Sequence, residues 1–254
     1  MSSIHERIAT PEAKGRYVRS LFATIAGRYD LITVILSYGR DRGWKRRLIG
    51  LIDLPRRDQS QDPPRAPLRA LDLATGTGDI AFALGGRVDA VVGLDLTKRM
   101  VEIAAAKASA RRGRERVPRF LVGDMLALPF PAASFDVVTT GYGLRNVPDL
   151  DGAIDEMLRV LKPGGQALSL DFDRPSSRAV LAAYLLYLNI VGAALGWLLH
   201  RDPDTYRYIP ASIRRYPGAA AVSRMMERRG FERVRNHAVL GGLMAIHHAR
   251  KPCA

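Results

Sequence analysis

The stretch LDLATGTGD (residues 71–79) decides the fold class of this chain. It follows an apolar segment, predicted as a strand over 69–74, and opens a helical pattern predicted over 79–86. Glycines at such a turn let the backbone approach a ligand closely, so Gly76 and Gly78 are candidate binding residues. With Ala81 the glycines also fit the dinucleotide pattern G-x-G-x-x-A, and a tight turn without a ligand is the plain alternative.

Apolar strands and helical patterns alternate on the C-terminal side of this stretch. Strand patterns cover 69–74, 90–94, 118–122, 135–140 and 166–171, and helical patterns cover 79–86, 97–110 and 149–161. After residue 175 follow an apolar stretch, a helix predicted over 219–229 and strand patterns at 232–239 and 243–249. This alternation is typical of an α/β fold with a mostly parallel sheet and helices on both faces. The last two strands predict an antiparallel hairpin at the sheet edge.

Helical patterns also precede the sheet. An amphipathic helix is predicted over 16–29, with Tyr29 as its last apolar anchor, and a second helical stretch surrounds Trp44 and Leu48. The segment 54–67 is rich in proline and polar residues and is typical of a linker. We therefore expect an N-terminal helical cap (1–53), a linker (54–67) and a main domain (68–254) with an insertion at 176–210.

Composition limits the function classes. The chain has 254 residues and a net charge of +14, from 33 Arg and 6 Lys against 25 acidic residues. This charge indicates attraction to nucleic acid or to an anionic membrane, or only a solvated arginine-rich surface. The single cysteine, Cys253, excludes a disulfide framework and a cysteine-rich zinc site. The first 15 residues have no apolar core, so we expect no secretory signal and a cytoplasmic location.

Acidic residues beside the glycine loop favour a cationic ligand, and acids at three successive strand ends favour a nucleoside. Asp72 and Asp79 lie on either side of the glycine loop, whereas a pyrophosphate prefers a helix N-terminus without competing anions. S-adenosylmethionine carries a sulfonium and an ammonium, and carboxylates can hold both. Asp95 can accept both ribose hydroxyls, and Asp124 can accept the adenine amino group. Asp79 can instead be a helix N-cap, and the others turn residues, but together with the glycines they predict a nucleoside pocket.

Four further motifs occur in order along the chain. They are FATIAGRYD (22–30) with SYG (37–39) and WKR (44–46), GYGLRNV (141–147), YRY (206–208) through SIR (212–214) with Pro217, and Gly241-Gly242 through His247. Together they resemble the ubiquinone/menaquinone biosynthesis C-methyltransferase family, over nearly the whole chain. The resemblance implies a Rossmann-like class I methyltransferase fold, S-adenosyl-L-methionine as cofactor and methylation of a polyprenyl quinol.

The predicted cofactor site combines the loop residues with positions that match the family's contacts. It contains Asp72, Gly76, Thr77, Gly78, Asp95, Asp124, Met125 and Gly141. The resemblance implies the contacts of Thr77, Asp95, Asp124, Met125 and Gly141. Gly141 stands where the family often has a serine, and Met125 contributes only backbone contacts to adenine.

Methylation of an aromatic carbon needs an electron-rich ring, so the enzyme must help a quinol hydroxyl lose its proton and stabilise the phenolate. Arg145 stays charged, so we assign it to the phenolate or a polarised water, with a structural salt bridge as the alternative. Asn146 can orient a water or the quinol hydroxyl, or cap a turn. Tyr29 can act as a hydrogen-bonding relay above the pocket, or only anchor its helix. His247 late in an edge strand is more often structural. No metal-ligand spacing occurs in the sequence, and transfer from a sulfonium requires no metal.

Residues 179–199 contain no charged side chain and are long enough for a membrane span, with Gly192 and Gly196 forming G-x-x-x-G. A span here would separate strands of one sheet. We therefore expect an apolar helical lid over a polyprenyl tail, with a buried core helix as the alternative.

The function that these observations favour is C-methylation of a polyprenyl quinol, with demethylmenaquinol to menaquinol as the preferred reaction. We expect a cytoplasmic enzyme bound peripherally to the inner face of the cytoplasmic membrane through anionic lipids, with no nucleic acid partner. The alternatives are a methyltransferase for another small hydrophobic acceptor (a natural product or a sterol-like molecule), a nucleic-acid-binding protein and a non-catalytic membrane-binding module. A homodimer, the tail length and the choice between naphthoquinol and benzoquinol stay open.

Overall fold

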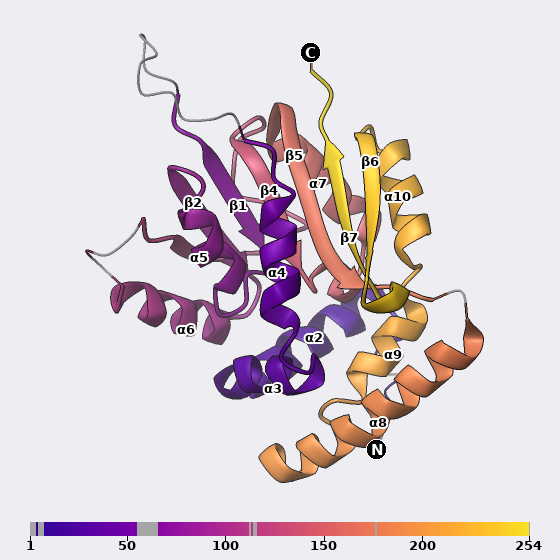
Figure 1. Cartoon of the computed structure of the whole chain (residues 1–254). Helices are drawn as coiled ribbons and strands as arrows, with labels where there is room; N and C mark the ends of the chain where they lie inside the picture. Colours follow the sequence, from indigo (N-terminus) through magenta and orange to yellow (C-terminus); the bar gives the residue numbers. More distant parts are fainter. Residues whose placement is uncertain are drawn as a thin grey trace.

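A seven-stranded sheet, in the order β3-β2-β1-β4-β5-β7-β6, forms the centre of the molecule in a computed structural model of the chain (Figure 1). The structure describes Ile4 and residues 8–54, 66–111, 113, 116–175 and 177–253. Most of the predicted linker at 54–67 lies outside the described residues, as does the first residue of the predicted insertion, Ser176. The division into cap, linker and main domain stays a prediction.

The strands confirm the predicted α/β class. They are β1 (Arg69–Leu73), β2 (Ala90–Asp95), β3 (Arg119–Val122), β4 (Phe135–Gly141), β5 (Leu161–Phe172), β6 (Glu232–Val239) and β7 (Met244–Arg250). β1 to β5 pair in parallel, and β7 runs antiparallel to both β5 and β6. β1 and β4 are buried along most of their length, as expected for parallel strands with helices on both faces. The hairpin of β6 and β7 forms at one edge of the sheet, as predicted. Within the hairpin β6 is the edge strand, and β7 lies between β6 and β5.

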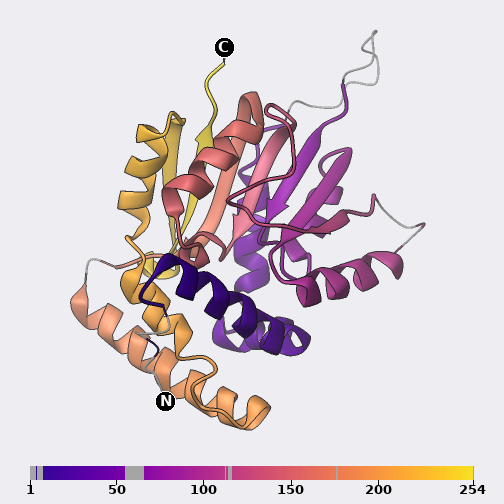
Figure 2. The ribbon, with the colours of Figure 1, turned by 180° about the vertical axis from the view of Figure 1, so that it is seen from behind.

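Helices cover both faces of the sheet (Figures 1 and 2). On one face α4 (Asp41–Gly50) and α5 (Asp79–Gly85) bury Leu48, Ile80 and Leu84 against β1, β4 and β5. On the other face α7 (Leu150–Val160) and α10 (Ala219–Arg228) pack through Met157 and Val222. α6 (Lys98–Ser109) lies along β2 and β3.

A second group of helices lies beneath the carboxyl ends of the parallel strands (Figure 1). It contains α2 (Pro11–Ile25), α3 (Tyr29–Leu36), α8 (Arg178–His200) and α9 (Tyr208–Arg215). Ile25 and Ile32 from the N-terminal helices pack with Leu195 of α8 and the buried Tyr206. The N-terminal helices and the apolar insertion therefore form one layer over the edge of the sheet where α/β proteins bind ligands.

The helix predicted over 16–29 is two helices in the structure. α2 ends at Ile25, a 3-10 turn covers Ala26–Arg28, and α3 begins at Tyr29. Gly27 weakens the helix at the bend, and Arg28 leaves the helical region with φ −122° and ψ 5°. Tyr29 therefore opens a second helix and is not the last anchor of the first.

The insertion also differs in detail from the prediction. The apolar segment is one helix, α8, whose first turn is capped by Ser177 through Val180 N. α9, which the sequence analysis did not predict, follows it and packs against α8.

β5 begins at Leu161, before the predicted start, and the register shifts between its pairings with Phe135 and Val137.

Candidate functional site

A pocket of about 880 Å³ lies at the carboxyl ends of β1, β2 and β4 and the turn after β3. β1 and β4 are neighbours in the sheet, so this is the point at which the strand order reverses, the usual binding crevice of an open α/β sheet. Five of the predicted cofactor residues line the pocket: Gly76, Asp95, Asp124, Met125 and Gly141. The structure thus brings most of the residues that were predicted to bind the cofactor together in one cavity.

The loop after β1 turns through residues with positive φ, and the amides of Thr75, Gly76 and Gly78 are hydrogen-bonded within the protein. Ala74 (φ 50°), Gly76 (φ 56°) and Gly78 (φ 95°) all have positive φ, which suits glycine and is strained for alanine. A Cβ at Gly78 would lie 2.8 Å from the Phe120 ring, so no larger residue fits there. The glycines therefore serve loop geometry, and Gly78 does not itself line the pocket.

Asp95 is held at the pocket wall by two backbone donors. Gly76 N donates to its Oδ2 at 2.8 Å, and Thr97 N donates to its Oδ1 at 2.8 Å. The side chain is 8% exposed, and burial raises its pKa although both donors lower it. A carboxylate fixed in this way still has free lone pairs toward the cavity, as a ribose contact requires.

Asp72 and Thr77 do not line the pocket. Asp72 is buried beneath the loop, where it accepts hydrogen bonds from Thr75 Oγ1 (2.6 Å) and Thr139 Oγ1 (2.7 Å). Burial raises the pKa of Asp72 to about 7. The Thr77 hydroxyl donates to Asp30 in α3. These hydrogen bonds hold the loop on the side away from the pocket. Asp72 and Thr77 therefore influence a bound ligand through the position of the loop backbone and not by direct contact.

Asp79 is not the N-cap of α5, and its carboxylate pairs with lysines and does not line the pocket. It is the first residue of α5, after the N-cap Gly78. Its carboxylate accepts from Lys45 Nζ at 3.0 Å and lies 4.0 Å from Lys107 Nζ. Among the residues that line the pocket, the acidic ones are Asp95 and Asp124.

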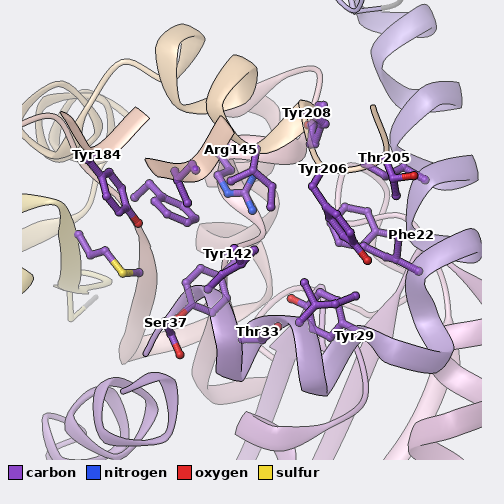
Figure 3. Close-up of a pocket in the computed structure, with 18 of the residues that line it drawn as sticks. Phe22, Tyr29, Thr33, Ser37, Tyr142, Arg145, Tyr184, Thr205, Tyr206 and Tyr208 are labelled. Carbon is purple, nitrogen blue, oxygen red and sulfur yellow. The ribbon is translucent and has the colours of Figure 1, made fainter. Parts of the chain in front are cut away.

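A second pocket, of about 710 Å³, lies between the sheet edge and helices α2, α3, α8 and α9 (Figure 3). Its wall is mainly apolar and aromatic: Leu21, Phe22, Ile25, Tyr29, Ile32, Thr33, Leu36, Ser37, Trp44, Tyr142, Arg145, Phe172, Tyr184, Leu188, Thr205, Tyr206, Tyr208, Ile209 and Met244. Phe22, Tyr29 and Tyr142 also line the first pocket. The two cavities therefore meet at these rings.

Arg145 is the one arginine in the wall of the apolar pocket (Figure 3). Its Nε lies 3.3 Å from Asp171 Oδ1, and Nη1 donates to Ser212 Oγ at 2.8 Å. The guanidinium also stacks 4.8 Å above the centre of the Phe172 ring. Nη2 has no hydrogen-bond partner among the described residues. Arg145 is thus both a buried ion pair and a cation with donor capacity left over.

The side chain of Asn146, which lines the first pocket, is held by three hydrogen bonds within the protein. Nδ2 donates to Tyr142 O at 2.7 Å, and Oδ1 accepts from Tyr208 Oη at 3.0 Å and Arg145 Nη1 at 3.3 Å. These contacts fix the turn that carries Arg145. Tyr29, in contrast, makes no hydrogen bond to another described residue, and burial raises the pKa of its hydroxyl.

Tyr142, Asp41 and Lys45 form a group that the sequence analysis missed. Tyr142 has φ 59°, an uncommon conformation for tyrosine, and its hydroxyl donates to Asp41 Oδ1 at 2.7 Å. Lys45 Nζ lies 2.6 Å from Asp41 Oδ2. Burial opposes the charge of Lys45, but Asp41 and Asp79 outweigh it and raise the pKa of the lysine. Tyr142 is part of the quoted GYGLRNV motif, but nothing local in the sequence connects it to Asp41.

Two further residues are explained by packing. A Cβ at Gly141 would lie 2.6 Å from Ile80 Cδ1, so a serine at this position would require the end of the Ile80 side chain to move. His247 contacts Ser169 Oγ (3.1 Å) and Ala219 O (3.0 Å), and burial lowers its pKa. It lines neither pocket, in agreement with a structural role.

Comparison with known proteins places nearly the whole chain in one family. A profile of the ubiE/COQ5 methyltransferase family matches residues 10–251. A demethylmenaquinone methyltransferase of Thermus thermophilus is 42% identical over 91% of this chain and 100% of its own length. A ubiquinone/menaquinone biosynthesis C-methyltransferase of Azotobacter vinelandii is 38% identical over 96% of this chain and 94% of its own.

Solved structures agree on the fold. An S-adenosylmethionine-dependent methyltransferase of Thermotoga maritima matches with a TM-score of 0.60 at 18% identity, over 92% of this chain and 99% of that one. A methyltransferase of Bacillus halodurans matches with a TM-score of 0.57 at 21% identity, over 82% and 98%. At these identities the similarity establishes the Rossmann-like methyltransferase fold.

Proposed function

Because the chain belongs to the ubiE/COQ5 methyltransferase family, we propose that it methylates a ring carbon of a polyprenyl quinol and converts demethylmenaquinol to menaquinol. The enzyme is an S-adenosylmethionine-dependent methyltransferase; the proposal concerns its acceptor and the roles of its residues. The observation that carries the proposal is the junction of the two pockets at Tyr29 and Tyr142, with Arg145 in the apolar wall.

The cofactor pocket suits S-adenosylmethionine. Asp95 is a buried carboxylate fixed by backbone amides, which suits a pair of ribose hydroxyls. Asp124 and Met125 line the same cavity and are proposed to hold the adenine, while Gly76 and Gly141 leave room for the rest of the molecule. When bound, the sulfonium supplies an electrophilic methyl group.

The apolar pocket suits an aromatic ring that carries an isoprenoid. Most of its wall is hydrocarbon or aromatic ring, eight of its residues carry a hydroxyl (five of them tyrosines), and one carries a charge. A cation in a dry wall stabilises a developing phenolate far more strongly than it would in water. We assign this role to Arg145, whose Nη2 is not used by the protein, with Tyr29 as a second donor and Asn146 as the residue that positions Arg145.

One proton must leave the acceptor for each methyl group that it gains. Tyr142 is placed to pass it on, because it lines the pocket and its hydroxyl already donates to Asp41. A proton taken up by Tyr142 Oη can be matched by transfer of the tyrosine's own proton to Asp41 Oδ1. Arg145 keeps its proton throughout, as expected of a guanidinium. In this proposal Tyr142 and Asp41 are the relay that the arginine cannot supply.

The proposed place of action is the inner face of the cytoplasmic membrane, with peripheral attachment. The net charge of +14 favours anionic lipid, and a polyprenyl acceptor is confined to a bilayer. Another small hydrophobic acceptor would fit the pocket but has no support from the relatives. The direct test is mass spectrometry of the quinones in a strain that lacks the protein. Accumulation of demethylmenaquinone, restored by the gene, is the expected result, and an unchanged quinone pool would refute the proposal.

A further inference from the structure

Exposed large apolar side chains are concentrated on one face of the molecule. Eleven such residues occur among the described residues, and nine of them lie on α3, the turn after it and α8: Leu31, Val34, Ile35, Tyr38, Val180, Leu186, Ile190, Trp197 and Leu198. We call this surface the α3–α8 face. α3 and α8 lie together at the end of the molecule farthest from the chain's C-terminus (Figure 1). A patch of this kind on a soluble chain marks an interaction site.

α8 is one-sided. Its most apolar stretch would suit a buried helix, yet only 28% of that stretch is buried in the protein. Leu185, Leu188 and Leu195 face the protein, whereas Trp197 and Leu198 are 67% and 69% exposed. At 23 residues the helix is about 34 Å long, and its outer side has no charged residue between its ends.

The inner side of α8 is already used by the protein, so the helix is not available as a span. A Cβ at Gly196 would lie 2.4 Å from Asp202 O, and one at Gly192 would lie 3.2 Å from Tyr206 Cβ. The G-x-x-x-G pattern therefore receives the loop that follows the helix and not a second transmembrane helix. A helix that is packed against the protein on one side and is apolar on its exposed side can lie along a membrane surface with that exposed side in the lipid.

Arginines occur at the ends of this face. Arg178 and Arg201 flank α8, Arg28 donates to Leu199 O, and Arg40 and Arg42 follow the turn at Tyr38. None of these five forms an ion pair with an acidic residue in the described parts of the chain. An apolar patch with unpaired cations at its ends is complementary to an anionic bilayer, because the arginines meet the headgroups as the apolar side chains enter the acyl boundary.

A row of aromatic rings connects the α3–α8 face to the site. Tyr142 contacts Phe172 (5.9 Å between ring centres), Phe172 contacts Tyr184 (6.4 Å), and Tyr184 stacks on Tyr187 (6.3 Å). Tyr187 in turn stacks on Tyr38 at 5.1 Å, and Tyr38 is 61% exposed. The row thus runs from the junction of the two pockets to the exposed face.

We propose that the α3–α8 face docks on the surface of an anionic lipid bilayer, and that the isoprenoid tail of the acceptor leaves the apolar pocket along this aromatic row into the lipid. The docking stands on the surface alone, whereas the tail route rests on the proposed function. In this arrangement the quinol ring reaches Tyr142 while its tail stays in contact with the bilayer.

The docking is tested by binding to vesicles of phosphatidylglycerol and phosphatidylcholine. Ile190→Glu and Trp197→Glu place a carboxylate in the face and should each weaken binding about tenfold or more. Leu121→Glu is the matched control, because Leu121 is 42% exposed on β3 and lies outside the face. It makes the same change in net charge and should have a much smaller effect. Equal binding by all four proteins would refute the docking.

Trp197 provides a second measurement. It is 67% exposed, so its emission should shift to the blue and be quenched by lipids brominated in the acyl chain, and Trp197→Phe should lose that response. Sedimentation tests the competing occupant, a second copy of this chain. A wild-type dimer that Ile190→Glu dissociates without loss of vesicle binding would overturn the proposal.

The tail route is tested at Tyr38 and Tyr187, which do not line the pocket. Tyr187→Ser and Tyr38→Ser should raise KM for a long-tailed quinol in vesicles by about tenfold and leave a short-chain analogue in solution unchanged. Equal effects on both acceptors would refute the route. Wild-type enzyme inactive on both would instead refute the proposed function, and the vesicle measurements would still decide the docking.

Discussion

Replacement of Arg145 is the perturbation whose effect depends most on the tertiary structure. Arg145→Met removes the ion pair with Asp171, at 3.3 Å, and the hydrogen bond to Ser212. Asp171 is 1% exposed, so it is left as an unpaired buried carboxylate. Breaking one partner of such a pair costs about 3–5 kcal/mol of folding free energy. A simple loss of activity in this variant would therefore not distinguish catalysis from misfolding.

The pH dependence identifies the unpaired carboxylate. Burial raises the pKa of Asp171, and Arg145 is the main group that opposes the rise. Without the arginine the folded-state pKa lies farther above the unfolded value of about 3.9, so the protonated carboxyl favours folding. The stability deficit of Arg145→Met should be smallest below about pH 4 and grow as the pH rises through the folded-state pKa.

Asp171→Asn in the same chain separates stability from chemistry. It removes the unpaired charge and should recover part of the lost melting temperature, because both partners of the pair are then neutral while one of the two backbone N–H groups that donate to Asp171 loses its acceptor. Turnover should stay about a hundredfold or more below wild type, since the donor to the phenolate is still missing. Arg145→Lys should recover turnover only in part, because it keeps the charge without the planar fork.

The assay is single-turnover methylation of a short-chain demethylmenaquinol analogue, with thermal unfolding of each variant at two pH values. Wild-type turnover in the stable double variant would refute the assignment of Arg145 to the phenolate. It would leave the arginine as the structural partner of Asp171 only.

Three further predictions follow from single contacts. Asp95→Ala should weaken S-adenosylmethionine binding by about 1.5–3 kcal/mol, measured by calorimetry, and unchanged affinity in a folded variant would contradict the ribose assignment. Tyr142→Phe breaks the 2.7 Å bond to Asp41 and should lower turnover about tenfold or more with little change in cofactor affinity, whereas normal turnover would exclude the relay. Asp72 has a folded-state pKa of about 7, raised by burial, so wild-type stability should fall as the pH rises from about 4 to 7. Asp72→Asn should flatten that part of the melting curve against pH, and an unchanged slope would show that Asp72 is not its source.

The sequence by itself determined the fold class and the family, and it indicated five residues that line one pocket at the carboxyl ends of the strands. These signals are local. Glycines in the loop predict positive φ angles there, and continuous apolar strand patterns predict strands that are buried on both faces. Acids such as Asp95 and Asp124, each at the end of a parallel strand, must reach the same sheet edge whatever the details of packing. Such features follow from short stretches of chain.

Only the tertiary structure separated residues that look alike in the sequence. Asp72 and Asp79 bracket the same loop, yet one is buried under two threonine hydroxyls and the other pairs with Lys45 from α4. Asn146 is next to Arg145 in the sequence, but its amide is hydrogen-bonded to Tyr142 O and Tyr208 Oη.

The apolar pocket is also a product of the fold, because its walls come from segments far apart in the chain. The hydrogen bond from Tyr142 to Asp41 joins the turn after β4 to α4, and no spacing or periodicity encodes such a contact. Residues 179–199 satisfied the length of a membrane span, and only packing showed which side is used. Gly192 and Gly196 receive the following loop, while Ile190 and Trp197 stay exposed. Hydrophobicity along a chain predicts that a segment will be buried, but its partner depends on the surfaces that folding brings together.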